Sequence, residues 1–418
     1  MVSLFSGAGG LDLGLESVGF ETLVATDVDE HSCRTLAIGK GEARVRGRRF
    51  LRSAGILKAD VRDLSSDEIL RTAGLKKGEL DLLAGGPPCQ AFSVFGQRKG
   101  REDPRGMLAF QYLRILADLQ PRSFVFENVY GLLSIEAGAV FADLVEKLAE
   151  PARGMHYELS IHRLNAVDFG VPQYRDRVFI IGHRDGARVG DIPTLTAPEG
   201  SLFSPTNSWR TVADALRGLP PMGAAFPANH VGRNHSQAIV SRYRSLKPGE
   251  RDPKTRINKL DLERPSFTII VGSDKGGGKG HVHPTEPREV TPRESARIQT
   301  FPDWWAFSGT SRHPIRQIGN AVPPLLAAAV GNEIRAQLFR LPRVPFEAVL
   351  SRLDQTHLFQ TDLASAKLGG CQSTAPSGAS TRALNSNGSR PYGWAPSTSS
   401  RDTKGKRTMT RTPQSMPN

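Results

Sequence analysis

The segment Val2–Leu13, VSLFSGAGGLDL, decides the predicted fold. It opens with a short apolar run at Val2–Phe5, continues through the glycine-rich Ser6–Gly10, and then places leucines at helical spacing. This order predicts a buried strand, a tight turn and a helix. Glycines in such a turn let backbone N–H groups approach a ligand closely at the helix N-terminus. The segment therefore predicts an α/β fold with a ligand site at its first turn.

A dinucleotide-binding fingerprint is incomplete in this turn. The pattern G-x-G-x-x-G needs a third glycine, and after Gly7 and Gly9 that position holds Asp12. A nicotinamide or flavin oxidoreductase is therefore disfavoured. The turn alone does not identify its ligand, because glycine is common in all proteins.

Further strands and helices alternate to about residue 183. Apolar runs of strand length lie at 22–25, 82–84, 123–126 and 177–182, and amphipathic helical patterns lie at 110–119 and 140–148. Such alternation predicts an α/β fold with a doubly wound, mostly parallel sheet that helices cover on both faces.

Acidic residues follow two of the predicted strands. Asp27 comes directly after the second strand, where a carboxylate accepts hydrogen bonds from ribose hydroxyls. Asp27 or Asp29 could equally cap the next helix. Asp60 lies near the end of another strand.

The segment Gly85–Ser93, GGPPCQAFS, interrupts a buried strand sharply. A cysteine just past such a break lies at the carboxyl edge of the sheet, where open α/β folds bind ligands. Cys89 is therefore a candidate nucleophile. The alternative is a small buried apolar residue, but the stiff Pro-Pro pair and the polar Gln90 and Ser93 favour chemistry.

Composition limits the possible partners. The 418 residues include 55 Lys and Arg against 42 Asp and Glu, a formal charge of +13 that indicates a polyanionic partner. The three cysteines form no C-x-x-C pair, so neither a disulfide framework nor a zinc site is expected. No apolar run reaches the roughly 18 residues that span a bilayer, and no signal peptide is evident, which predicts a soluble, intracellular protein.

Two irregular stretches have simpler structural interpretations. Residues 39–56 carry six basic side chains against one acid, which fits a solvated loop or a phosphate contact. His281 and His283 lack helical i, i+4 spacing and a nearby cysteine, so we expect surface residues rather than metal ligands.

Changes in composition along the chain predict its domains. Residues 1–183 form the first domain, 184–290 a smaller, irregular β-rich domain with much Pro, Gly, His and Arg, and 291–340 return to the first. A C-terminal extension follows at 341–364. Residues 365–418 are rich in Ser, Thr, Pro and Gly and hold eight basic residues and one acid, so we expect a disordered basic tail.

Six blocks, in this order, resemble the DNA cytosine-5 methyltransferase family, the prokaryotic modification enzymes. The resemblance covers residues 3 to about 338 and rests on Phe5–Gly10, Gly86–Gln90, Glu127–Val129, Gln173–Arg177, Arg293–Asp303 and Gln317–Pro324. The family implies S-adenosylmethionine as methyl donor, no metal, and a catalytic domain interrupted by a target-recognition domain at 184–290 that reads bases in the major groove.

The resemblance also implies the catalytic residues. Carbon 5 of cytosine is a poor nucleophile, so the thiolate of Cys89 first adds at carbon 6. Glu127 binds ring nitrogen 3 and the exocyclic amine, and donation to nitrogen 3 requires a protonated carboxyl of raised pKa. A strand-end cap is its structural alternative. Arg175 and Arg177 help to orient the site.

The methyl donor would contact residues in three of these blocks and two acids outside them. Asp27 takes the ribose, Asp60 the adenine amine, and Asn320 closes the pocket. The implied set is Phe5, Ser6, Gly7, Ala8, Gly9, Gly10, Asp27, Asp60, Pro87, Asn320 and Ala321. Asp27 stands where many relatives have Glu, which preserves an acceptor.

The implied partner is double-stranded DNA, from which the target cytosine must be flipped at a cost of a few kcal/mol. A monomer in the cytoplasm, associated with the nucleoid through DNA, is expected, together with a possible cognate restriction endonuclease. A tRNA cytosine-5 methyltransferase on the same scaffold is one alternative. The other is a catalytically idle DNA-binding regulator, against which the set Cys89, Glu127 and Arg177 argues.

Overall fold

The computed structural model describes residues 1–88, 107–201, 207–269, 280–310 and 312–360. The chain divides into two units, 1–368 and 369–418. The predicted nucleophile Cys89 and the predicted tail at 365–418 lie outside the described residues.

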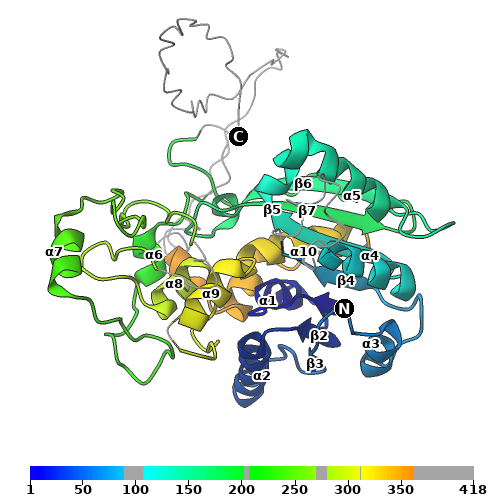
Figure 1. Cartoon of the computed structure of the whole chain (residues 1–418), viewed down its shortest axis with the longest axis horizontal. Coiled ribbons are helices and arrows are strands. Elements are labelled where there is room, and N and C mark those ends of the chain that lie inside the picture. The colour runs from blue at the N-terminus through cyan, green and yellow to red at the C-terminus, as the bar shows by residue number, and fades with distance from the viewer. Residues whose placement is uncertain (89–106, 202–206, 270–279, 311, 361–418) are drawn as a thin grey trace, which may run out of the picture. The chain divides into compact units, whose positions relative to one another are not determined.

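A seven-stranded sheet forms the centre of the first unit, in the order β3-β2-β1-β4-β5-β7-β6 (Figure 1). The five strands from β3 to β5 pair in parallel, whereas β7 runs antiparallel to both β5 and β6. The strands are β1 Val2–Leu4, β2 Val24–Asp27, β3 Gly55–Lys58, β4 Leu82–Gly85, β5 Ser123–Val129, β6 Glu158–Asn165 and β7 Asp176–His183. The predicted doubly wound, mostly parallel sheet is confirmed.

The two faces of the sheet bury separate hydrophobic cores. Leu82 and Val125 belong to one core, while their neighbours Leu83 and Phe124 belong to the other. This division follows from the period of two along a strand. Strands buried on both faces read as continuous apolar runs, which explains why β1, β4 and β5 were predictable.

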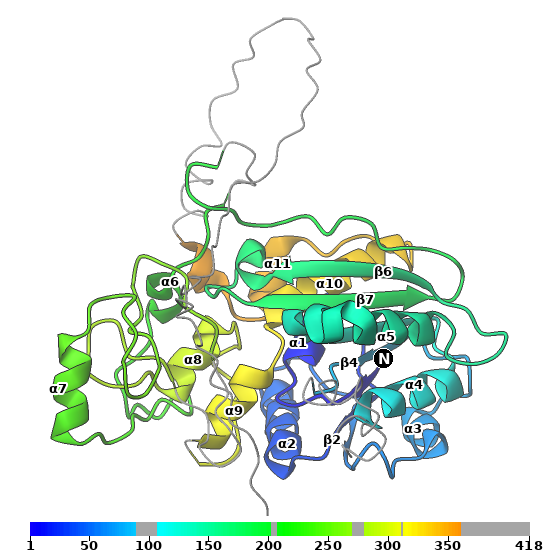
Figure 2. The same ribbon diagram turned by 45° about the horizontal axis from the view of Figure 1, so that its top comes forward.

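Helices cover both faces (Figure 2). The first core lies under α1 Gly10–Ser17, α2 Glu30–Val45 and α10 Pro324–Gln337, and the second under α3 Ser66–Ala73, α4 Met107–Leu119 and α5 Ala139–Ala149. Helices α1 and α10 pack closely because glycines lie between them. A Cβ added to Gly14 would lie 2.4 Å from the Cβ of Ala327.

The region 184–290 is less regular. It contains α6 Val212–Leu216 and α7 Gln237–Ser245, and its described residues form only isolated bridges in place of the predicted strands. A small core of Tyr243, Leu246, Ile257 and Val282 lies beneath α7, at the end of the unit away from the sheet (Figure 1). Because residues 1–368 form one unit, the domain boundaries at 184 and 290 stay a prediction.

The remaining elements are η2 Tyr130–Gly138, η3 Ala166–Phe169, α8 Pro292–Ile298, α9 Arg312–Asn320, α11 Phe346–Arg352 and η4 Thr356–Phe359. The last two belong to the predicted extension at 341–364, whose described part, residues 341–360, is folded. Arg217 donates through Nη1 to the carbonyl oxygen of His357 at 3.0 Å.

The basic stretch 39–56 is the end of α2 and the loop that leads to β3. Arg48 donates to the carbonyl oxygen of Arg352 at 2.7 Å and lies over Trp304, 5.4 Å from its ring centre. Arg46 pairs with Glu42 and lies over Phe226. Part of the stretch therefore packs against the protein rather than forming a solvated loop.

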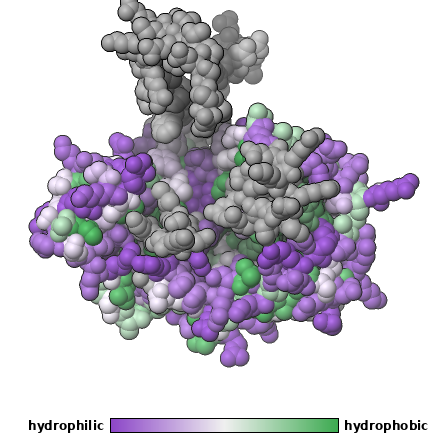
Figure 3. Space-filling model, viewed as in Figure 1, coloured by the Kyte–Doolittle hydropathy of each residue, from purple (hydrophilic) through white to green (hydrophobic). Residues whose placement is uncertain are grey.

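The polar surface is extensive. On the face shown in Figure 3, hydrophobic residues occur in small separate groups among hydrophilic ones. Within the described residues, no helix combines the length and the apolar character needed to cross a bilayer.

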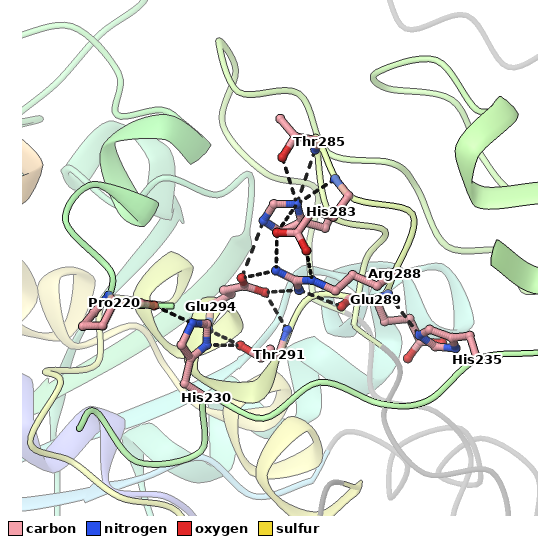
Figure 4. Close-up of polar contacts among 10 residues, drawn as sticks. Pro220, His230, His235, His283, Thr285, Arg288, Glu289, Thr291 and Glu294 are labelled. Atoms are coloured by element: carbon pink, nitrogen blue, oxygen red, sulfur yellow. Dashed lines mark hydrogen bonds and ion pairs between the residues drawn. The ribbon is translucent and has the colours of Figure 1, made fainter. Parts of the chain in front are cut away.

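The prediction for His281 and His283 is wrong, because both are buried. Figure 4 shows His283 and Arg288 converging on Glu294 at the start of α8. Arg288 donates to both carboxylate oxygens of Glu294 at 2.8 Å, and His283 Nε2 lies 3.5 Å from Oε1. We call His230, His283, Arg288, Thr291 and Glu294 the Arg288 cluster. Tertiary packing, which spacing does not reveal, brings these side chains together.

Candidate active site

Two of the predicted catalytic residues, Glu127 and Arg177, lie together at the edge of the sheet where β5 ends and β7 begins. Strands β4 and β5 are parallel, so the segment after β4 and the last residues of β5 meet at one edge of the sheet. The antiparallel strand β7 starts at the same edge, where Arg177 pairs with Val129 in register. This topology brings Arg177 beside Glu127, although fifty positions separate them in the sequence.

Glu127 is buried, with 8% of its surface exposed. Its Oε1 accepts from Nε of Arg177 at 2.8 Å. Its Oε2 points at Gly86, where an added Cβ would lie only 2.6 Å away. Burial raises the pKa of Glu127 above its ordinary value, although Arg177 and Arg175 oppose the rise.

The segment before Cys89 is attached to β5 as well. Asn128 donates through Nδ2 to the carbonyl oxygen of Pro87 at 3.0 Å. Pro87 is buried and Pro88 is exposed. Gly86 and Pro87 are therefore held beside Glu127 and Asn128 of β5.

Arg175 has a different set of contacts from Arg177. It is fully buried, and its Nη2 donates to the carbonyl oxygens of Gly319 at 2.7 Å and Ala321 at 3.0 Å. Burial and the nearby Arg177 hold its pKa well below the usual value of an arginine. Arg175 thus holds the end of α9 and the turn that leads to α10. Asn320, the last residue of α9, is exposed. We call residues 319–323 the Asn320 turn.

The glycine turn lies against that second turn. Gly9 has a left-handed φ of 79° and caps α1, and an added Cβ on Gly10 would lie 2.2 Å from the carbonyl oxygen of Val322. Gly7 also has a positive φ of 53°, but an added Cβ there would meet only the Phe5 carbonyl oxygen, at 4.0 Å. The turn is closed on the side of Val322 and open at Gly7.

Asp27 is joined to the same turn. Its Oδ2 accepts from the Gly7 N–H at 2.8 Å and its Oδ1 from the Asp29 N–H at 2.8 Å. Burial raises its pKa, against the effect of these two hydrogen bonds. The residue that caps α2 is Asp29, whose Oδ2 accepts from the Ser32 N–H at 2.8 Å. Asp27 is therefore not the helix cap.

Asp60 follows β3 and is engaged by a neighbour. Nε of Arg62 donates to Oδ1 at 2.9 Å, and this hydrogen bond lowers the pKa of Asp60. Among the described residues, its carboxylate forms no hydrogen bond to another member of the predicted donor set.

Two nearby residues escaped the sequence analysis. Val28 is 63% exposed at the carboxyl end of β2, between Asp27 and Asp29. Val28 could have been found from the sequence, because it is an apolar residue between two acids directly after a predicted strand. Asp12, treated only as a missing glycine, is a buried carboxylate. Burial raises its pKa to about 6, although a hydrogen bond from Ser3 opposes the rise.

These residues fit a nucleoside-bearing methyl donor. The open side of Gly7, the carboxylate of Asp27 and the exposed Val28 offer polar and apolar contacts along one edge of the sheet. In the described part of the chain, His, Cys, Asp and Glu side chains form no group of three or more that could hold a metal.

Comparisons with known proteins agree with this geometry. The family model for C-5 cytosine-specific DNA methylase matches residues 1–336. Type II methyltransferase M.XorII from Xanthomonas oryzae is 33% identical over 83% of this chain and 87% of its own length. Type II methyltransferase M.FnuDI from Fusobacterium nucleatum is 31% identical over 81% and 94%.

Solved structures show the same fold. A DNA modification methyltransferase encoded within an Escherichia coli prophage superposes with a TM-score of 0.62 at 27% identity, over 81% of this chain and 99% of its own. The Dnmt2 methyltransferase of S. pombe superposes with a TM-score of 0.56 at 17% identity, over 80% and 98%.

Proposed function

The chain belongs to the C-5 cytosine-specific DNA methylases, and from this premise we propose that it modifies one short duplex sequence through Cys89 and Glu127. It is a DNA cytosine-5 methyltransferase that uses S-adenosylmethionine. The named relatives are Type II methyltransferases, which supports a role in restriction-modification beside a cognate endonuclease. The enzyme acts as a monomer, and residues 184–290 read the site.

The observation that carries the catalytic assignment is the pairing of Glu127. Because Arg177 occupies Oε1, the oxygen left for a substrate is Oε2, beside the segment that leads into Cys89. The raised pKa of Glu127 favours a proton on the carboxyl. A protonated Oε2 donates to nitrogen 3 of a flipped cytosine, which makes carbon 6 more electrophilic.

The covalent step belongs to Cys89. Its thiolate forms a bond to carbon 6, and the electrons of the 5,6 double bond become available at carbon 5. S-adenosylmethionine supplies an electrophilic methyl group to that carbon. Loss of the proton from carbon 5 and departure of the Cys89 sulfur then restore the double bond. A free cysteine has a pKa of about 8.5, so the site must favour the thiolate.

The donor would be held at the turn between β1 and α1. Each carboxylate oxygen of Asp27 has a further acceptor position, because a carboxylate offers about four, so it can also bind ribose hydroxyls. Val28 supplies an apolar surface for the adenine ring, and Asn320 approaches from the second turn. Asp60 binds the adenine amine only if it shares its carboxylate with Arg62.

Transfer of labelled methyl groups tests the proposal. Purified enzyme with labelled S-adenosylmethionine should label duplex DNA from a methylation-free host and leave tRNA unlabelled. Labelled tRNA with unlabelled DNA would identify a tRNA enzyme instead. Binding of DNA without transfer to either nucleic acid would favour the idle regulator.

A further inference from the structure

Three fully buried polar side chains form a connected chain beneath the active site. Gln173 and Gln299 are 0% exposed and Arg175 is 1% exposed. Gln173 and Arg175 lie in the segment before β7, whereas Gln299 lies at the carboxyl end of α8. Buried amides cost free energy unless they are hydrogen-bonded, so the partners of this chain define its role.

One end of the chain is the region 184–290. Oε1 of Gln173 accepts from the Ile269 N–H at 3.0 Å. Around this contact, the backbone of residues 172–174 bridges to Ser266, and the Thr268 hydroxyl donates to the Tyr174 carbonyl oxygen at 2.6 Å. The segment Ser266–Ile269 is therefore attached firmly to the residues that precede β7.

The other end is the turn that carries Asn320. Nε2 of Gln173 donates to Oε1 of Gln299, and Nε2 of Gln299 donates to the Ala321 carbonyl oxygen at 2.6 Å. The same carbonyl accepts from Nη2 of Arg175 at 3.0 Å. The turn is thus held jointly by Gln299 and Arg175.

The direction of these hydrogen bonds leaves a single arrangement. Because Ile269 donates to Oε1 of Gln173, the amide nitrogen of Gln173 faces Gln299. The oxygen of Gln299 must then accept, which directs its nitrogen at Ala321. Rotating either amide by half a turn breaks two hydrogen bonds. A displacement of Ile269 is consequently felt at Ala321 through two side chains.

From this connection we propose that Gln173 and Gln299 are positioning residues that couple DNA binding in the region 184–290 to donor binding at the Asn320 turn. The inference rests on the proposed function, because it takes the two ends of the chain as the DNA and donor sites. Neither amide touches a reacting atom. The pair acts by holding the turn in the position that Ser266–Ile269 requires when DNA is bound.

Coupling between two ligands is measurable as a ratio of affinities, and it is reciprocal. The dissociation constant of a fluorescent duplex that carries the recognised site is measured with and without saturating S-adenosylhomocysteine. We expect the native chain to bind at least about fivefold more tightly with the cofactor product, the lower end of usual couplings. Calorimetric titration of S-adenosylhomocysteine with and without DNA should give the same ratio.

Removal of either amide should remove the coupling. Gln299→Met keeps the length of the side chain and deletes both of its hydrogen bonds, so the ratio should fall below about twofold. Gln173→Met should do the same, and the double variant should lose no more than either single one, because both residues belong to one chain of bonds. A purely structural role would lower the folded fraction without changing the ratio among folded molecules.

Gln337→Met is the matched control. Gln337 also bridges two groups, accepting from the Gly190 N–H at 2.7 Å and donating to Glu333 at 2.6 Å, but it lies outside this chain of bonds. Its variant should retain the native ratio. Should Gln299→Met fail to fold, Gln173→Met removes the same connection from its other residue.

Two results would overturn the inference. One is a native chain that methylates DNA but shows equal DNA affinity with and without S-adenosylhomocysteine. The other is a folded Gln299→Met or Gln173→Met variant that keeps the native ratio. Failure of the native chain to bind S-adenosylhomocysteine or to methylate DNA would instead contradict the proposed function.

Discussion

Two buried glutamates, Glu127 at the sheet edge and Glu294 in the Arg288 cluster, have pKa values that are shifted in opposite directions. Their exposed fractions are similar, 8% and 3%. Burial raises the pKa of both, but hydrogen bonds from Arg288 outweigh it at Glu294 and hold that pKa below its ordinary value, whereas the pKa of Glu127 remains raised.

The difference lies in the number of donors. Glu294 accepts from two nitrogens of Arg288 and from the Thr291 N–H at 2.7 Å, which completes the cap of α8. Among the described residues, Glu127 accepts a hydrogen bond only from Arg177, at one of its two oxygens. A buried carboxylate whose oxygens are both engaged stabilises the fold, and one with an unengaged oxygen is available for proton donation.

Exchanging each glutamate for glutamine should separate these roles most strongly. Glu127→Gln cannot supply the acidic proton, so kcat should fall by about 10²- to 10⁴-fold, with S-adenosylmethionine affinity retained and a melting temperature no lower than the native one. Single-turnover methyl transfer measures the first and calorimetry the others. Glu294→Gln is the matched variant and should lose stability while its folded fraction stays active. Nearly native turnover by Glu127→Gln would remove it from the mechanism.

Removal of Arg288 should mainly affect stability. Arg288→Met leaves the carboxylate of Glu294 buried without its main partner, which costs about 3–5 kcal/mol of unfolding free energy. Urea unfolding measures this cost, and kcat per active site should stay close to native. A loss below about 1 kcal/mol would mean that the ion pair does not hold α8.

A methyl group beside Glu127 should have a smaller effect. The Cβ of Gly86→Ala would lie 2.6 Å from Oε2, so the carboxyl must move, and a displacement near 1 Å costs roughly 10²-fold in rate. Gly131→Ala is the control, because an added Cβ there meets nothing within 4 Å. Methyl-transfer rates that are equal in the two variants would contradict the position assigned to Oε2.

The pH dependence of stability should differ in sign at the two sites, with effects on the order of 1 kcal/mol. Glu294 contributes stability that is present above its unfolded pKa, about 4.3, and is lost as the pH falls through its folded pKa. Glu127 opposes folding as the pH rises through its raised folded pKa. Relative to the native chain, Glu127→Gln should therefore gain stability and Glu294→Gln should lose it between pH 4 and 8. Melting curves that shift in the same direction for both variants would refute the comparison.

The sequence was sufficient to predict helices and strands wherever a local pattern of apolar residues matches the residues that are buried in the fold. The strand, turn and helix at residues 2–17 and the buried strand at 123–129 follow from continuous apolar runs and glycine. Strand β6 was missed because it is an edge strand with mixed burial and carries no such run.

Long-range contacts were beyond the sequence. Arg177 was placed near Glu127 by resemblance alone, since the antiparallel pairing of β7 is what brings them together. Nothing local in Gln173 or Gln299 indicates a contact across 126 positions. His283 appeared to be a surface residue because its partners, Arg288 and Glu294, are recognisable only after folding.

Bisulfite sequencing of DNA from a methylation-free host that expresses the native chain, Cys89→Ser or Glu127→Gln tests the roles of both residues together. We expect protected cytosines within one short motif for the native chain, none for Cys89→Ser, and strongly reduced protection for Glu127→Gln. Absence of protection by soluble native protein, or protection that persists in Cys89→Ser, would contradict these roles.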